Sequence, residues 1–161
     1  METQIAEKPY VTTLAGNLPR FVLELHRFVS KDPFRQSLTS VLIEPTGANA
    51  GSKPGLRAVA TDGHMMAIVD WTDESGLAEA LAGSPALLIG NQLAVLAKAT
   101  KKVEIWSFDN NMATLSGSTI GPIAAEPRPN TPVTRFPAYE QVIPCPQEGP
   151  SVSFGVNLEL L

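Results

Sequence analysis

The stretch RAVATDGHMMAIVDW, residues 57–71, predicts an antiparallel β-hairpin, and the fold class follows from it. Apolar runs flank Asp62-Gly63 on both sides. This dipeptide between such runs is the strongest short-range hairpin signal, because a two-residue turn needs positive φ at its central residues. We therefore predict strands over 56–61 and 64–70. The predicted hairpin pairs Thr61 with His64, Val59 with Met66 and Arg57 with Ile68.

Three side chains at the end of this hairpin, those of Thr61, His64 and Met66, then share one face. A small hydroxyl, an imidazole and a flexible thioether are typical of an adaptable apolar docking pocket. A simpler alternative is a hairpin end at which His64 only makes local hydrogen bonds. An enzyme is not favoured, because a metal site needs three or more ligands and His26, the only other histidine, has no acidic residue at ligand spacing. We expect no catalytic residue, no metal and no cofactor.

The composition is that of an ordinary globular protein of one domain. The chain has 161 residues, of which 43% are apolar and 17% charged, and this length is enough to bury a core. No apolar run approaches the roughly 18 residues of a membrane helix. The first residues lack the basic start and apolar core of a signal peptide, and the single cysteine, Cys145, excludes an internal disulfide. We therefore expect a cytoplasmic protein.

The order strand, helix and three strands occurs twice along the chain, although no residue-level repeat is visible. Two helices against a largely antiparallel sheet make an α+β layer. The predicted elements are a strand over 10–14, a helix over 18–31, strands over 37–45, 56–61 and 64–70, then a strand over 86–90, a helix over 91–102 and strands over 103–108, 112–117 and 119–125.

Both predicted helices have an apolar side and a basic side, and Asn17 is the predicted N-cap of the first. The apolar residues at helical spacing are Phe21, Val22, Leu25, Phe28 and Val29 in the first helix and Leu93, Leu96 and Ala97 in the second. The basic residues are Arg20, Arg27 and Lys31, with Glu24 among them, and Lys98, Lys101 and Lys102. The net charge of −4 argues against a protein that is basic all over. These faces are either ordinary solvated surfaces or two local stripes for nucleic acid.

A second motif, TRFPAYEQVIP at residues 134–144, favours the nucleic-acid interpretation. Together with LRAVATDGHMMAIV at 56–69, it resembles the middle domain of the bacterial sliding clamp, the DNA polymerase III beta subunit. The first motif is similar to the family's VATDGHRLA signature and the second to its RFPDY…VIP segment. The resemblance covers roughly residues 10–148. It implies a DNA-clamp domain with pseudo-duplicated strand-helix-three-strand units and two helices packed on antiparallel sheets.

The resemblance further implies a non-enzymatic processivity factor in DNA replication. In the family, several such domains close into a ring whose helices line the hole, so the basic residues above would face the phosphates of double-stranded DNA. Such contacts are independent of sequence, and we expect them to be weak for an isolated chain. The family also has a hydrophobic groove that receives short peptides from DNA polymerases and clamp loaders. The residues at the groove positions here are Leu38, Thr61, Gly63, His64, Met66, Pro137 and Val142.

The sequence departs from the family at two positions of the first motif, at Gln141, and in length. Met65 and Met66 replace the usual Arg-Leu pair, and Gln141 stands where many members carry arginine, which leaves the choice of peptide open. A family protomer has three domains. Here residues 1–9 are a predicted flexible N-terminus, 10–148 a clamp-like domain and 149–161 the start of a following domain or a tail. The chain is expected to be a piece of a three-domain clamp or a single-domain relative, bacterial or phage-borne. An alternative is an adaptor that binds partner peptides without encircling DNA, and either protein could form a homo-oligomer.

Overall fold

We describe the chain from a computed structural model. The structure describes residues 14–46, 54–81, 84–99, 101–110, 112–115, 118–122 and 136–143. Both predicted terminal segments, and all but the last residue of the strand predicted over 10–14, lie outside these ranges.

The predicted α+β class is confirmed, since short helices alternate with antiparallel strands. In chain order the elements are β1 (Gly16–Pro19), α1 (Arg20–Glu24), the 3₁₀ turns η1 (Leu25–Phe28) and η2 (Gln36–Leu38), β2 (Ser40–Thr46), β3 (Gly55–Thr61), β4 (Met66–Thr72), α2 (Leu77–Leu81), β5 (Ala86–Ile89), α3 (Gly90–Ala99), β6 (Ile105–Asp109), β7 (Met112–Leu115), β8 (Ser118–Pro122) and η3 (Tyr139–Val142).

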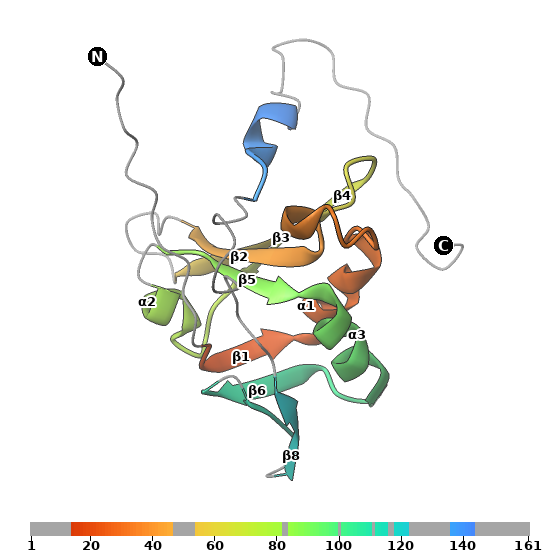
Figure 1. Cartoon of the computed structure of the whole chain (residues 1–161). Coiled ribbons are helices and arrows are strands. Elements are labelled where there is room, and N and C mark those ends of the chain that lie inside the picture. Colours follow the sequence, from red (N-terminus) through yellow and green to blue (C-terminus); the bar gives the residue numbers. More distant parts are fainter. Residues whose placement is uncertain are drawn as a thin grey trace, which may run out of the picture.

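Two antiparallel sheets form the framework, and each takes strands from both halves of the chain (Figure 1). One sheet has the strand order β4-β3-β2-β5, and the other has the order β1-β6-β7-β8. The strand that opens each half, β1 or β5, therefore joins three strands of the other half. Pro19 of β1 pairs with Ile105 of β6, and Ile89 of β5 pairs with Ser40 of β2.

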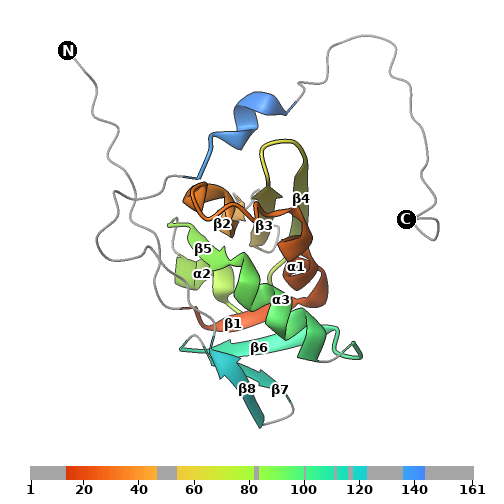
Figure 2. The ribbon, with the colours of Figure 1, turned by 45° about the vertical axis from the view of Figure 1, so that its right-hand side comes forward.

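The helices that follow β1 and β5 begin in equivalent ways. The N–H of Arg20, the first residue of α1, donates to the carbonyl oxygen of Glu104 at 2.8 Å. The N–H of Gly90, the first residue of α3, donates to the carbonyl oxygen of Thr39 at 3.0 Å. Glu104 directly precedes β6, which pairs with β1. Thr39 directly precedes β2, which pairs with β5. Both α1 and η1 contact α3, so the helices lie side by side (Figure 2).

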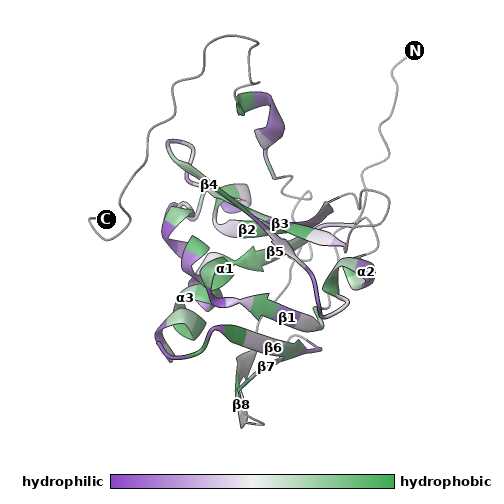
Figure 3. Cartoon of the chain, turned by 180° about the vertical axis from the view of Figure 1, so that it is seen from behind, coloured by the Kyte–Doolittle hydropathy of each residue, from purple (hydrophilic) through white to green (hydrophobic). Residues whose placement is uncertain are grey.

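One hydrophobic core joins both sheets to the helices. Figure 3 shows hydrophobic residues along β1 and β6 of one sheet and along β5 of the other. Burying one large apolar side chain contributes about 1.5–3 kcal/mol, so the sheets and helices stabilise each other through shared contacts. The fully buried members include Leu18, Leu23, Leu88, Leu93 and Trp106.

The first helix is shorter than the predicted helix over 18–31. α1 ends at Glu24 and continues as the 3₁₀ turn η1, a common way for an α-helix to end. The prediction of Asn17 as the N-cap is wrong, because Asn17 lies in β1 and its N–H donates to Ser75 Oγ at 2.9 Å. The start of α1 is bound to the sheet through the N–H of Arg20 instead.

The apolar stripe of this helix also differs from the prediction. Leu23, outside the predicted stripe, is fully buried, whereas Phe21, within it, is 42% exposed and meets Trp71 edge to face. The reason is that α1 contacts both β1 and α3 and so buries more than one side. Leu93, Leu96 and Ala97 of α3 are buried as predicted. Among the other boundaries, β2 begins at Ser40, β4 covers Met66–Thr72, α3 ends at Ala99 and β6 begins at Ile105.

Candidate functional site

The turn between β3 and β4 is a four-residue loop, Asp62 to Met65, and the predicted two-residue turn is wrong. The N–H of Asp62 donates to the carbonyl oxygen of Met65 at 3.3 Å and closes the loop. The predicted pairs Thr61–His64, Val59–Met66 and Arg57–Ile68 are replaced by Thr61–Met66, Val59–Ile68 and Arg57–Asp70.

The side chains of Asp62 and Thr61 account for the longer loop. Asp62 Oδ1 accepts the backbone N–H groups of His64 and Met65, each at 2.8 Å. Thr61 Oγ1 accepts the N–H of Gly63 at 3.1 Å and donates to the carbonyl oxygen of Met65 at 2.6 Å. Aspartate and threonine compete in this way with backbone pairing, and Gly63, with φ 93°, supplies a conformation that favours glycine. The Asp-Gly signal therefore predicts the position of the turn but not its length.

The change of register leaves the two faces of the hairpin unchanged. Side chains alternate between the faces along a strand, and a pairing that moves by two residues keeps each side chain on its predicted face. Thr61 and Met66 therefore still share a face. His64 lies in the loop beyond the ladder and is exposed, and its neighbour Met65 is 55% exposed.

Replacing Asp62 with alanine is expected to disorder this loop, whereas asparagine should preserve much of it because its amide oxygen accepts the same bonds. The N–H groups of Met65 and then His64 hold the pKa of Asp62 below its ordinary value, which is about 3.9. A carboxylate with a lowered folded-state pKa stabilises the fold above its ordinary pKa, and this stability is lost as the pH falls through the lowered value. In an NMR pH titration, the amides of His64 and Met65 should shift with a midpoint below about pH 3.9. A midpoint at or above that value contradicts the bonding described here.

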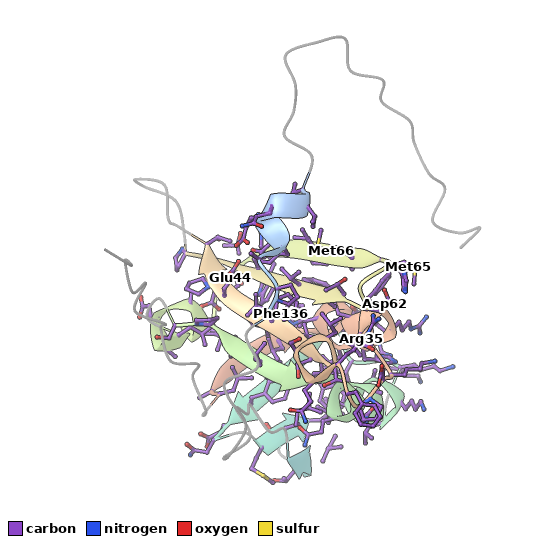
Figure 4. The ribbon with its side chains drawn as sticks, turned by 45° about the horizontal axis from the view of Figure 1, so that its top comes forward. Arg35, Glu44, Asp62, Met65, Met66 and Phe136 are labelled. Carbon is purple, nitrogen blue, oxygen red and sulfur yellow. The ribbon has the colours of Figure 1, made fainter. Side chains whose placement is uncertain are left out.

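The second motif packs on the face of the β4-β3-β2-β5 sheet that lies opposite the main core. Phe136 and Tyr139 are 5% and 3% exposed, and their rings meet edge to face with centroids 6.4 Å apart. Met66 of the first motif packs against the same cluster, so the two motifs are in contact (Figure 4). The remaining members of the cluster are Leu42, Val59, Leu87 and the half-buried Ile68.

On the hairpin side, the structure brings predicted groove residues together in pairs. Leu38, at the end of η2, lies beside Gly63, since a Cβ on that glycine would be 3.7 Å from Leu38 Cδ1. Buried Thr61 pairs with half-buried Met66. The fifth residue, His64, is exposed in the loop.

The other two predicted groove residues, Pro137 and Val142, lie in the second motif, and their neighbours hold them at this surface. Pro137 and Val142 are exposed, Val142 at 68%. They flank Tyr139, which is buried in the cluster together with Phe136. The turn therefore presents Pro137 and Val142 to solvent while its aromatic residues attach it to the sheet.

Sequence reasoning misses four residues of this surface. Arg35 Nη1 donates to the carbonyl oxygen of Asp62 at 3.3 Å, and the hydroxyl of Tyr139 donates to Glu44 Oε1. Phe136 and Tyr139 are the aromatic residues of the second motif, so their apolar rings were a usable signal. No comparable signal in the sequence identifies Arg35 or Glu44.

The six basic residues predicted to face DNA lie in different environments. Arg20 is half-buried and ties α1 to α3, since it donates to Glu24 Oε1 at 3.0 Å and to the carbonyl oxygen of Ala97 at 2.9 Å. Glu24 Oε2 also pairs with exposed Arg27 at 2.9 Å, so one carboxylate binds two of the predicted arginines. The four lysines, Lys31, Lys98, Lys101 and Lys102, are exposed, and the last two lie beyond the end of α3.

Two features of other protein classes are absent from the described ranges. In these ranges no group of three or more His, Cys, Asp or Glu residues is arranged to hold a metal ion. The helices of the same ranges are too short or too polar to span a membrane. In comparisons with known proteins, no family model, no curated protein and no solved structure matches the chain.

Proposed function

We propose that the chain is a DNA sliding-clamp domain that docks short peptides of DNA polymerases or clamp loaders on its hairpin loop and the turn η3. The observation that carries this proposal is the contact between the two motifs, in which Met66 packs against the cluster of Phe136 and Tyr139. These are the motifs through which the sequence resembles the clamp's middle domain. They come from distant parts of the chain, and a groove built from both requires that they meet.

Exposed apolar side chains at this surface support a docking role. Phe34 is 94% exposed, Met65 55% and Val142 68%. The loop that contains Phe34 lies against the hairpin loop, because Arg35 donates to the carbonyl oxygen of Asp62. Grouped apolar side chains on a surface mark interaction sites more often than scattered ones do.

The sheet topology supports a pseudo-duplicated clamp domain. Each half contributes a strand to the sheet of the other half, and each half starts its helix with an equivalent hydrogen bond, from Arg20 to Glu104 and from Gly90 to Thr39. Two related units packed face to face would produce this arrangement. The duplication is part of the proposal, since the two halves share no visible sequence repeat.

The proposed DNA contacts rest mainly on the exposed lysines of the helix pair. Lys98, Lys101 and Lys102 come from the end of α3 and the residues after it, and each is exposed. Lysines neutralise phosphates without reading sequence, as a ring that slides along DNA requires. The dissociation constant of an isolated chain should lie at the weak end of the usual non-specific range of about 10⁻⁴ to 10⁻⁶ M.

A second candidate function is an adaptor that binds partner peptides without encircling DNA. The observation in its favour is the pairing of Glu24 with both Arg20 and Arg27, which reduces the net positive charge of α1 and η1. The mass of the chain in solution, with and without DNA, separates the two candidates. A ring needs several copies or further domains and retains DNA, whereas an adaptor needs neither and binds no DNA.

An NMR titration with a clamp-binding peptide of a replicative polymerase tests the proposed docking surface. We expect shifts to concentrate at residues 61–66 and 137–142, with an affinity near millimolar, or about −4 kcal/mol, because one domain buries only part of the peptide. A peptide whose apolar anchors are replaced by alanine serves as the control and should give no shifts there. Shifts that spare the hairpin and cluster elsewhere would contradict the proposal.

A further inference from the structure

A row of charged residues crosses the sheet face on which the second motif packs. The strand register places Glu44 of β2 opposite Arg57 of β3, and Arg57 opposite Asp70 of β4. Arg57 binds Asp70 through two bonds, from Nε to Oδ1 at 2.7 Å and from Nη2 to Oδ2 at 2.8 Å. This bidentate pair engages both oxygens of Asp70. Glu44, at the other end of the row, binds a partner from the turn.

That partner is Tyr139, whose hydroxyl donates to Glu44 Oε1. Burial, and then the hydrogen bond to Glu44, raises the pKa of Tyr139 well above its ordinary range, so the hydroxyl keeps the proton that it donates. The next residues of the turn, Glu140, Gln141 and Val142, are all exposed. Within η3, the attachment to the sheet therefore depends on Tyr139.

The apolar contacts of this ring do not fix its orientation by themselves. Hydrophobic burial is non-directional, and the Tyr139 ring packs in a cluster of aliphatic and aromatic side chains. A hydrogen bond from a buried hydroxyl to a carboxylate is directional and strong. Arg57 also interacts with the Tyr139 side chain, and Glu44, as the acceptor of the hydroxyl proton, fixes how the ring lies and, through it, how the turn is held.

We propose that Glu44 is a positioning residue, which holds Tyr139 and thereby keeps Val142 where it can contact a bound peptide. The effect on the peptide rests on the proposed function. The attachment of the turn does not, because it follows from the contacts of Tyr139 with Glu44 and with the cluster.

Amide hydrogen exchange and peptide affinity together test this role in four variants of the full chain. Tyr139→Phe keeps the ring and removes its hydroxyl, and Glu44→Ala removes the acceptor. Glu140→Ala removes a carboxylate of the same kind from the exposed side of the turn and is the matched control. The double variant Glu44→Ala/Tyr139→Phe tests whether the two residues act as one unit.

The amides of Gln141 and Ile143, which bond to Ala138 and Glu140 within the turn, report its attachment. We expect about tenfold faster exchange in both single variants, the effect of losing one hydrogen bond to a charged group. The double variant should exchange no faster than the single ones, and Glu140→Ala should exchange like the parent. Peptide affinity should fall in proportion to the fraction of chains whose turn remains attached, because only the attached turn binds.

Each outcome has a defined meaning. Unchanged exchange in Tyr139→Phe and Glu44→Ala would overturn the attachment by Glu44. An affinity that does not follow the fraction of attached turns, in a chain that binds the peptide, would overturn the positioning of Val142. A parent chain that binds no peptide refutes the proposed function instead, and the exchange rates then still decide whether Glu44 holds the turn.

Discussion

Replacing Met66 with aspartate is expected to abolish peptide binding. Met66 is half-buried at the contact between the two motifs, where we propose that an apolar anchor of the peptide docks. Burying such an anchor is worth about 1.5–3 kcal/mol, a large share of a millimolar affinity, which corresponds to about −4 kcal/mol. A carboxylate facing the anchor would lose its water without gaining a partner. The NMR titration should therefore show no saturable shifts.

Two further variants separate loss of the surface from loss of the fold. Met66→Leu introduces the leucine of the clamp motif that this sequence resembles, keeps an apolar side chain and should bind like the parent. Val142→Asp places a charge on the other side of the surface, and because Val142 is 68% exposed, it should cost little stability. We expect Val142→Asp to lose binding while its thermal unfolding stays that of the parent. Full binding by Val142→Asp would contradict a peptide surface that includes the turn.

Reversing Lys98, Lys101 and Lys102 to glutamate is expected to remove most of the binding to double-stranded DNA. Each phosphate contact contributes about 0.9 to the slope of log affinity against log salt, so the loss of three contacts should flatten that slope by nearly three. Fluorescence anisotropy with a labelled duplex at several salt concentrations measures both effects. Circular dichroism checks that the triple variant remains folded.

A charge-matched pair of single variants controls for the general loss of positive charge. Lys98→Glu and Arg35→Glu change the net charge equally, but Lys98 lies in α3 whereas Arg35 lies beside the hairpin loop. Only Lys98→Glu should weaken DNA binding and reduce its salt dependence. Equal effects of the two variants, or a triple variant that binds like the parent, would identify the lysines as an ordinary solvated face.

Local signals in the sequence predicted the helices and strands of this fold well, but they did not predict how these elements pair and pack. Alternation and Asp-Gly predict the β3–β4 hairpin, and the spacing of Leu93, Leu96 and Ala97 predicts the buried side of α3. The exchange of β1 and β5 between the sheets is not predictable in this way, because it depends on pairing between residues as distant as Gly16 and Phe108.

The candidate site shows the same limit. The motif residues Thr61 and Met66 keep their predicted face because the register moved by an even number of residues. The predicted length of the loop between β3 and β4 was wrong, because the side chains of Asp62 and Thr61 bind backbone groups that a shorter turn would have paired with each other. The pairing of Glu24 with two arginines depends on geometry that composition does not contain.

The exchange of strands makes the folding of each half of the chain depend on the other half. Neither half contains all the strands of a sheet, because β1 completes the β6-β7-β8 sheet and β5 completes the β4-β3-β2 sheet. Pairings between distant residues require large loops to close before they contribute stability, which slows folding. Once formed, the two sheets depend on each other, because the loss of either opening strand, β1 or β5, exposes an unpaired edge in the sheet of the opposite half. The whole domain should therefore unfold as one unit rather than half by half.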